Sequence, residues 1–364
     1  MTRDSRLTTH DFFMYRCLQL AENGAGFVAP NPMVGAILVH ENKIIGEGYH
    51  EQYGGPHAEV NCINSVHADH RDLISHSTLY VSLEPCAHFG KTPPCSELIM
   101  ANQIPEVVIG CRDPFKEVNG KGIEKLQAGG VTVIQGVLEQ ECKRLNKRFF
   151  TFHTQHRPYI ILKWAESADR RMSANGAERL LITNEQTNRL VHKWRSEEAS
   201  ILVGTNTALC DDPELTTRYW NGPSPIRLVV DMDLRLPASL KLFNGNQATI
   251  VFNTREHSEE LESFGTPSPL VEREGARYYH VTEDVNLVHQ ILNALYQLKI
   301  QSVLVEGGAR LLQSFIDEDM WDEVRIISNT QLTIGNGLAA PELETPNLEQ
   351  EFMIQTDSVK IYSK

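Results

Sequence analysis

The sequence predicts an α/β protein with two domains. The chain has 364 residues, which is too long for one typical hydrophobic core. Apolar runs of strand length alternate with amphipathic stretches of helix length, and this alternation is typical of sheets covered by helices. The composition changes around residues 143–158, where the basic and aromatic segment KRLNKRFFTFHTQHRP separates two such series. We therefore place one domain at 1–150, a linker at 151–157 and a second domain at 158–364.

In the first domain, a helix is expected over residues 8–22. Thr8 and Asp11 have the spacing of a capping box, and apolar residues recur at helical intervals after them. A turn with two prolines, APNPMVG, leads into the strand AILV, and KIIGEGYH follows as its hairpin partner. A further helix should begin near His57. The remaining strands of this domain are TLYVSL at 78–83, EVVIGC at 106–111 and VTVIQG at 131–136.

The second domain starts a new series of apolar runs after Pro158. Helices are expected near 184–196, 284–298 and 309–316, and the polar segment 253–276 is expected to be a surface excursion. The expected strands are YIILK, ASILVG, IRLVVD, ATIVF, SVLVEGG and EVRIIS. Strands and helices alternate as in the first domain, so this domain should also be α/β.

Composition and charge limit the classes of function. The net charge is −13, and no dense block of Lys and Arg offsets the repulsion from nucleic-acid phosphates, which favours a small-molecule substrate. No apolar stretch approaches the roughly 20 residues that span a bilayer, and the first residues lack the apolar core of a secretory signal. Seven cysteines in a chain of this length favour free or metal-bound thiols in a reducing cytoplasm. We expect a cytoplasmic enzyme that binds neither nucleic acid nor membranes.

Three residues of the first domain have the chemistry of a catalytic zinc site. His57 follows a Gly-Gly-Pro turn, and Cys86 and Cys95 end the segment CAHFGKTPPC. One imidazole and two thiolates suit zinc, and three protein ligands leave a fourth position open for water. Glu59 is placed to move a proton between that water and a leaving amine. The H-x-E and P-C parts match zinc nucleobase deaminases, although eight residues separate the cysteines where that signature has two.

Other interpretations of these residues remain open. The His and Cys side chains could pack in a core, or Cys111 or His88 could complete a closed, structural zinc site. The chain could also be a deaminase of nucleic-acid bases whose second domain binds the polynucleotide, which its acidic charge disfavours. A third possibility is a non-catalytic protein with a structural zinc and a second domain that senses a ligand. An open fourth position at the metal would separate the catalytic from the structural interpretation.

Four segments of the first domain carry a family resemblance: PNPMVGAILV, GEGYHEQYGGPHAEV, LYVSLEPCAHFGKTPPC and DPFKEVNGKGIEKLQAGG. They closely resemble the N-terminal half of the bifunctional riboflavin-biosynthesis deaminase/reductase family, RibD. The resemblance implies a cytidine-deaminase-like three-layer α/β/α domain with one zinc per chain. It implies that Glu59 is catalytic and that the metal ligands are His57, Cys86 and Cys95. It also implies substrate contacts, the last two near a phosphate, from Asn31, His50, His88 and Lys91. From the residues alone, Asn31 could be a turn residue and His50 an exposed side chain.

The second domain lacks the G-x-G-x-x-G turn of common dinucleotide-binding folds. In VEGGARLLQSF, a strand ends at Glu306, and Gly307 and Gly308 could bring backbone N–H groups to a phosphate at a helix start. Two glycines after a strand are also a common turn. The segments KWAESADRRMS, LCDDPELTTR and RLVVDMDLRLP resemble the reductase half of the same family. That resemblance implies a dihydrofolate-reductase-like α/β domain that uses NADPH.

The resemblance also assigns reductase residues by position. Substrate contacts are implied for Arg179, Arg195, Leu215, Arg218 and Glu306. A guanidinium group binds a phosphate monoester through paired hydrogen bonds, although either Arg195 or Arg218 could instead form a surface ion pair. Cofactor contacts are implied for Ala165, Leu181, Thr207, Asp211, Met232, Gly307, Gly308, Ala309, Arg310, Leu311, Leu312 and Gln313.

Four positions depart from the pattern of the family around the reductase pocket. Arg170 stands where Gly is usual, Arg179 and Leu181 where Ser and Trp are common, and Met232 where a small polar residue is frequent. The two halves together imply zinc-dependent deamination of 2,5-diamino-6-(5-phosphoribosylamino)pyrimidin-4-one. NADPH-dependent reduction of the ribosyl to the ribityl chain of 5-amino-6-(5-phosphoribosylamino)uracil would follow. A homo-oligomer, a dimer or a tetramer, is also expected.

Overall fold

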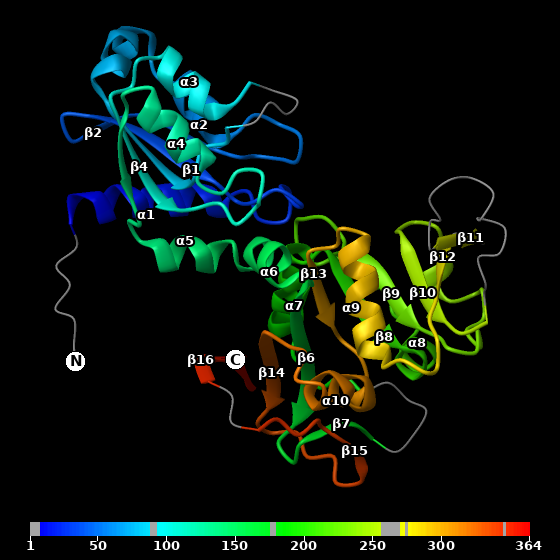
Figure 1. Cartoon of the computed structure of the whole chain (residues 1–364). Helices are drawn as coiled ribbons and strands as arrows, with labels where there is room; N and C mark the ends of the chain where they lie inside the picture. The colour runs from blue at the N-terminus through cyan, green and yellow to red at the C-terminus, as the bar shows by residue number, and fades with distance from the viewer. Residues whose placement is uncertain (1–7, 88–92, 175–179, 256–269, 274–275, 345–346) are drawn as a thin grey trace, which may run out of the picture. The chain divides into compact units, whose positions relative to one another are not determined.

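The chain divides into two compact units, unit 1 (Met1–His156) and unit 2 (Arg157–Lys364). The computed structural model describes residues 8–87, 93–174, 180–255, 270–273, 276–344 and 347–364 (Figure 1). Residues 151–155, expected to be linker, instead continue helix α6 (Lys147–Gln155), because this helix buries Phe149, Thr151 and Phe152. Among the described helices, none has both the length and the apolar character that crossing a membrane requires.

Unit 1 is built on one mixed sheet. Its described strands are β1 (Gly35–His40), β2 (Lys43–Tyr49), β3 (Thr78–Leu83), β4 (Glu106–Cys111) and β5 (Thr132–Gln135). They lie in the order β2-β1-β3-β4-β5, with β1 antiparallel to both neighbours and β3, β4 and β5 parallel. The strands β3 and β4 have the predicted bounds, and β2 is the predicted hairpin partner of β1.

Helices cover both faces of this sheet, which confirms the expected three layers (Figure 1). The helices are α1 (Thr9–Glu22), α2 (Ala58–Ser65), α3 (Cys95–Ala101), α4 (Lys121–Ala128), α5 (Glu139–Leu145), α6 and the 3-10 helix η1 (Ala68–His76). Helices α2, α3 and α4 pack on one face, and α1 and α5 pack on the other. The predicted capping box is present, since the side chains of Thr8 and Asp11 accept each other's backbone N–H groups.

Close packing places α2, the helix that begins beside His57. A Cβ atom on Gly48 would lie 2.2 Å from the backbone nitrogen of Cys62, so only glycine allows this approach of β2 to α2. The buried face of α2 then contacts the sheet through Ala58, Cys62 and Ile63. The start of α2 is therefore held firmly relative to the strands.

Unit 2 is built on a larger mixed sheet. Its described strands are β6 (Tyr159–Ser167), β8 (Ser200–Gly204), β9 (Ile226–Val230), β10 (Thr249–Asn253), β11 (Leu270–Arg273), β12 (Ala276–His280), β13 (Ser302–Val305), β14 (Glu323–Asn329), β16 (Asn347–Ile354) and β17 (Asp357–Ser363). Their order is β11-β12-β10-β9-β8-β13-β6-β14-β17-β16, parallel from β12 to β14 and antiparallel at both ends. A separate ribbon pairs β7 (Arg171–Ala174) with β15 (Gly337–Ala339). The expected surface excursion at 253–276 contains β11, and its residues 256–269 and 274–275 lie outside the described part.

Helices also cover both faces of the unit 2 sheet. They are α7 (Glu185–Glu197), α8 (Thr205–Asp211), α9 (Leu287–Gln297), α10 (Ala309–Asp317) and the 3-10 helix η2 (Lys241–Phe243). Helices α9 and α10 pack on one face (Figure 1), and residues of α7, α8 and η2 pack on the other. The apolar strand runs and helical stretches found in the sequence thus form the expected α/β architecture.

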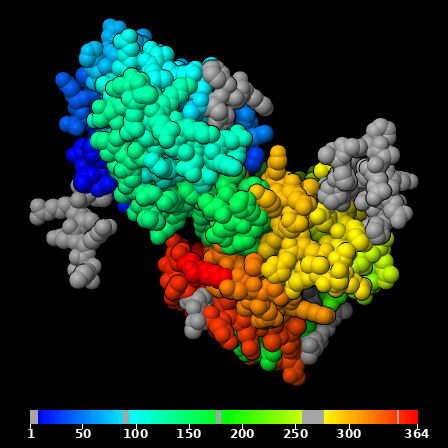
Figure 2. Space-filling view, viewed as in Figure 1, coloured from blue at the N-terminus to red at the C-terminus, as the bar shows by residue number. Residues whose placement is uncertain are grey.

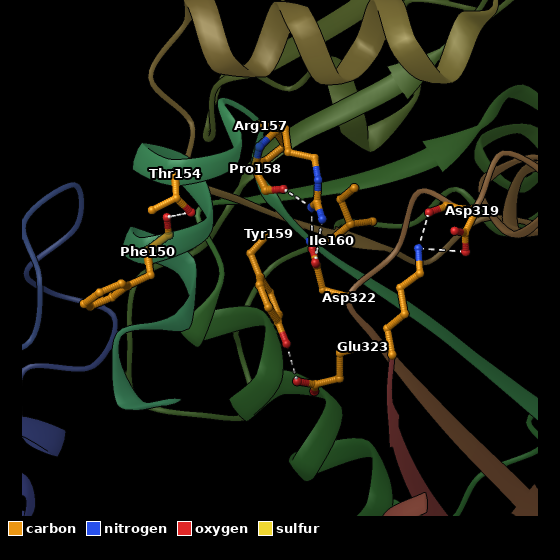
Figure 3. Close-up of polar contacts among 10 residues, drawn as sticks. Phe150, Thr154, Arg157, Pro158, Tyr159, Ile160, Asp319, Asp322 and Glu323 are labelled. Carbon is orange, nitrogen blue, oxygen red and sulfur yellow. Dashed lines mark hydrogen bonds and ion pairs between the residues drawn. The ribbon is translucent and has the colours of Figure 1, made fainter. Parts of the chain in front are cut away.

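The start of unit 2 is clamped to the start of β14 (Figure 3). The guanidinium group of Arg157 donates two hydrogen bonds to the carboxylate of Asp322, at 2.6 and 2.7 Å, and one to the carbonyl of Pro158. The same carboxylate accepts the backbone N–H of Ile160 at 2.8 Å. Both charged side chains are largely buried. The first residues after the unit boundary therefore belong firmly to unit 2.

Candidate active sites

The three predicted metal ligands of unit 1 converge. Their ligand atoms all lie within 4.8 Å of one another, and His57 Nδ1 is 3.7 Å from Cys86 Sγ and 3.3 Å from Cys95 Sγ. A tetrahedral zinc ion with bonds of about 2.0–2.3 Å needs ligand atoms roughly 3.5–3.8 Å apart. The separations and the ligand types therefore fit zinc.

Each ligand stands at the end of a helix or strand. His57 is the N-cap residue of α2, and Cys95 is the first residue of α3. Cys86 follows β3 by three residues, and its Sγ accepts the backbone N–H of Cys95 at 3.3 Å. Glu59 lies in the first turn of α2 and is 3% exposed. The helix starts and the strand end therefore fix the positions of the ligands and of Glu59.

The cluster is electrostatically prepared for a cation. Hydrogen bonds with the Cys95 thiol and the His57 ring lower the pKa of Cys86 to about 4. The hydrogen bond between His57 and Cys86 raises the pKa of His57 to about 9. The hydrogen bond between Cys95 and Cys86 raises the pKa of Cys95. Burial raises the pKa of Glu59. Zinc binds thiolates and neutral imidazole, so binding of a cation would displace the protons of this cluster.

Asn31 and His50 join this cluster. The His50 ring is edge-on to the His57 ring at 5.7 Å between centroids. His50 Nδ1 lies 2.9 Å from the carbonyl oxygen of Pro56, which only accepts hydrogen bonds, so Nδ1 carries the proton. His50 Nε2 therefore accepts from Asn31 Nδ2 at 3.1 Å. This bond orients the amide of Asn31, and His50 is buried rather than exposed.

Of the two residues considered as a fourth protein ligand, Cys111 and His88, the structure describes only Cys111. Cys111 packs in the apolar core on the α1 side of the sheet, and its Sγ bonds to the carbonyl of Ser82 at 3.5 Å. It is not a member of the metal-binding group. His88, together with Lys91, lies outside the described residues, as does Arg179 of unit 2.

In unit 2, Arg195 and Glu306 contact each other. Nε and Nη2 of Arg195 bond to the two carboxylate oxygens of Glu306 at 2.9 and 2.7 Å. Lys163 Nζ lies 3.6 Å from the same carboxylate. Burial by itself raises the pKa of Glu306, but the charges of Arg195 and Lys163 outweigh this effect and lower it to about 2. Lys163 was not predicted as a site residue, because it lies in the strand segment KWAES and carries no signal of its own.

His192 and Arg218 lie near Arg195, because the charges of both arginines act on the His192 ring. Arg218 contacts Glu214 at 3.4 Å and lies over the ring of Tyr219, which in turn packs edge-on against His192. Burial and the charges of Arg195 and Arg218 lower the pKa of His192 to about 4. His192 is therefore neutral at pH 7, while Arg195, Lys163 and Arg218 are cations whose described contacts are with the carboxylates of Glu306 and Glu214. Such a site suits an anionic ligand.

The low pKa of His192 predicts a pH-dependent loss of stability. An unfolded histidine takes up a proton below about pH 6.5, whereas His192 in the folded protein stays neutral down to about pH 4. Its contribution is complete above pH 6.5 and is lost as the pH falls, by about 2 kcal/mol between pH 7 and pH 5. Urea unfolding of unit 2 at both values should show this loss, and His192→Gln should show a smaller one. An equal loss in the variant would contradict this assignment. The contribution of Glu306 is lost only below about pH 4.5.

The glycines after β13 have different roles. A Cβ atom on Gly307 would lie 2.7 Å from a terminal methyl of Leu311, so a larger residue would fit only if that side chain moved. A Cβ atom on Gly308 would make only ordinary contact, at 3.5 Å, with Thr207 Oγ1. Gly308 caps the start of α10, where backbone N–H groups can bind a phosphate. Thr207 on α8 thus lies beside the predicted phosphate-binding turn, and this arrangement fits a dinucleotide.

The other predicted cofactor residues do not all lie in one place. A cleft of about 410 Å³ beside α10 includes Ala309, Arg310 and Gln313. Leu312 is instead fully buried in the core. The other predicted residues lie on separate elements: Ala165 on β6 and packed in a core, Asp211 at the end of α8, Met232 after β9 with its carbonyl bonded to Thr254, Leu311 partly buried on α10, and Leu181 with 75% of its surface exposed.

The structure shows the surroundings of two further positions, Leu215 and Arg170. Leu215 is 2% exposed and packs in the core, so only its main chain remains available to a substrate. Arg170, at the position of the usual glycine, has φ +58° and donates a hydrogen bond to the carbonyl of Pro341. Glycine is favoured at such a φ, and this chain holds an arginine there instead.

Comparison with known proteins agrees with the two sites. The profile of the cytidine and deoxycytidylate deaminase zinc-binding region matches residues 7–111, and that of the RibD C-terminal domain matches residues 158–353. The riboflavin biosynthesis protein RibD of Aquifex aeolicus is 36% identical over 96% of this chain and 94% of its own length. RibD of Escherichia coli is 32% identical over 86% of each chain.

A solved structure extends the similarity to the whole fold. It is a diaminohydroxyphosphoribosylaminopyrimidine deaminase/5-amino-6-(5-phosphoribosylamino)uracil reductase from Thermotoga maritima. It matches with a TM-score of 0.85 and 35% identity, over 98% of both chains.

The fold, the metal-binding cluster and these matches define a class, a zinc-binding deaminase joined to a reductase. The chain belongs to the RibD family of riboflavin biosynthesis proteins. It is a bifunctional enzyme, a hydrolase and an oxidoreductase, whose cofactors are zinc and NADPH.

Proposed function

We propose that the two activities are divided between the two units, with deamination in unit 1 and reduction in unit 2. The substrate of the first step is the diaminopyrimidinone ribosyl phosphate, and that of the second is the resulting aminouracil. The convergence of His57, Cys86 and Cys95 beside a buried glutamate is the observation that carries this proposal. Similarity to the Thermotoga maritima enzyme supports the choice of substrates.

In unit 1, zinc supplies the Lewis acidity that makes water nucleophilic at neutral pH. Glu59 takes a proton from the attacking water and delivers one to the departing amine, so that the amine-bearing carbon gains oxygen and ammonia leaves. Burial raises the pKa of this carboxyl group, which favours its uptake of a proton. Asn31 presents its amide to the pyrimidine edge, because its Nδ2 is already held by His50.

In unit 2, NADPH when bound would supply the hydride that reduces C1 of the opened ribosyl chain. Arg195, Lys163 and Arg218 bind the phosphate of the substrate and so orient the chain. Glu306 holds Arg195 and Lys163 in place through its carboxylate. The start of α10 and Thr207 hold the phosphates of the cofactor.

Removal of zinc tests the division of activities. Purified protein should contain about one zinc ion per chain. Stripping the metal with a chelator should abolish ammonia release, while NADPH oxidation with the deaminated pyrimidine continues at its former rate. Re-addition of zinc should restore deamination. Ammonia release that survives complete loss of zinc would contradict the proposed site.

The edge of the unit 2 sheet supports the proposal of a homodimer. Strand β16 pairs with β17 on one side, and Leu348, Phe352 and Met353 on it are 36–55% exposed. Figure 2 shows the C-terminal residues, coloured red, at the surface. Edge strands with exposed apolar side chains are templates for pairing with a second copy.

Light scattering on a size-exclusion column tests this dimer. The wild-type mass should be twice the 41.1 kDa of one chain, or a higher even multiple. Met353→Lys should lower it, and Val285→Lys, at another exposed apolar residue, should not. A monomeric wild-type chain would reject the proposal. We also propose a cytoplasmic enzyme, which suits seven cysteines that form no disulfide in the described structure.

A further inference from the structure

Glu84 is a buried carboxylate beside the metal cluster that takes no part in the steps above. It is 4% exposed and lies between the last residue of β3 and the Pro85–Cys86 pair. Its two oxygens accept four backbone N–H groups, those of Asp113 (3.3 Å), Gly120 (3.0 Å), Gly122 (3.0 Å) and Ile123 (3.3 Å). So many donors on one side chain indicate a specific anchoring role.

The four donors belong to the loop after β4 and to the first turn of α4. N–H groups in the first turn of a helix have no partner within the helix, and a carboxylate there satisfies them and is favoured by the helix dipole. Glu84 thereby joins the residue before Pro85 to a segment up to 39 residues later in the chain. Two parts of unit 1 meet at this one side chain.

The contact at this junction is close. A Cβ atom on Gly122 would lie 1.9 Å from the carbonyl oxygen of Pro85, so any larger residue would force the two backbones apart. The backbone N–H of Glu84 also donates to the carbonyl of Cys111 at 3.0 Å, which extends the pairing of β3 with β4. The peptide before Cys86 is therefore held by a strand on one side and by α4 on the other.

Cys86 is held from its other side as well. Its carbonyl oxygen accepts the backbone N–H of Ser96 at 3.1 Å, and its sulfur accepts that of Cys95. Zinc binds tightly only when all ligand atoms are in place together. A shift of the peptide that precedes Cys86 would move one ligand relative to the other two.

We propose that Glu84 is a positioning residue of the zinc site, which fixes Cys86 by binding the loop and first turn of α4. The inference rests on the zinc site proposed above. Groups that hold a metal ligand in place typically account for 10–100-fold in metal affinity or activity. Glu84 acts at one remove, through the backbone rather than through the side chain of the ligand.

The substitution Glu84→Gln tests this role. Glutamine has nearly the same shape, but its NH₂ group would face two of the four donors, so two hydrogen bonds are lost. Zinc should pass to a coloured chelator about 10–100-fold faster than from the wild type, and kcat for deamination should fall. NADPH oxidation with the deaminated pyrimidine should be unchanged. Gly122→Ala should speed zinc release by a different route, the clash with Pro85.

A control separates positioning from general stability. Val108→Ala removes fully buried packing on the α1 side of the sheet and should lower the melting temperature of unit 1 without faster zinc release. Zinc release from Glu84→Gln at the wild-type rate would overturn the proposal. So would equally fast release from Val108→Ala. A wild-type protein that holds no zinc would instead reject the metal site itself, and the two failures are thus distinct.

Discussion

Replacing Glu59 by glutamine should lower the turnover number for ammonia release by about 10²- to 10⁴-fold while zinc stays bound. The amide has nearly the shape of the carboxylate but cannot take up and return a proton. The three ligands are unchanged, so the metal content should remain about one per chain. Steady-state ammonia release and metal analysis of the same sample measure both quantities.

A matched substitution controls for the loss of a charge in unit 1. Glu47 lies on β2, away from the metal cluster, and forms a partly exposed ion pair with Arg16. Glu47→Gln removes the carboxylate of this pair. The variant should keep a turnover number for deamination within about twofold of the wild type, because exposed ion pairs contribute little to the stability of the folded protein. Normal deamination by Glu59→Gln would exclude proton transfer by this residue.

Replacing Arg195 by methionine should destabilise unit 2 by about 3–5 kcal/mol and raise KM for the phosphorylated pyrimidine. Glu306 would remain buried with Lys163, 3.6 Å away, as its remaining cation among the contacts described. A buried carboxylate that loses its closest cation is costly, and the loss of the guanidinium also removes a phosphate ligand. Urea unfolding and NADPH oxidation measure the two effects separately.

Arg218→Met separates stability from substrate binding. Its side chain is 41% exposed and contacts Glu214 at 3.4 Å, so the free energy of unfolding should change by less than about 1 kcal/mol. KM for the phosphorylated substrate should still rise.

The double variant Arg195→Met/Glu306→Gln should regain part of the stability lost by Arg195→Met, since the carboxylate that lost its closest cation is gone. If the double variant were no more stable than Arg195→Met, Arg195 and Glu306 would not be energetically coupled.

The regular elements were predictable because their signals are local, and the convergence of His57, Cys86 and Cys95 was predictable from their chemical types. The apolar runs of β3 and β4 have the predicted bounds, and the Thr8–Asp11 capping box forms. The ligand set followed from chemical type, since one histidine and two cysteines suit an open zinc site. The structure then brought these residues together, as Cys95 Sγ at 3.3 Å from His57 Nδ1 shows.

Features that depend on tertiary contacts could not be predicted in this way. The bond between Arg195 and Glu306 joins residues 111 positions apart, and neither neighbourhood in the sequence points to the other. The polar strand β16 was missed because it lies at an edge with nearly every residue exposed, so no apolar alternation marks it. Leu215 is named by family position, yet its burial shows that the side chain serves the core.

The Arg157–Asp322 clamp has a practical bearing on how the two halves could be produced separately. A fragment that began at Tyr159 would leave the Asp322 carboxylate, at the start of β14, without the guanidinium that it binds. A gene for an independent reductase should accordingly keep Arg157 as its first native codon, and one for the deaminase should end no earlier than α6.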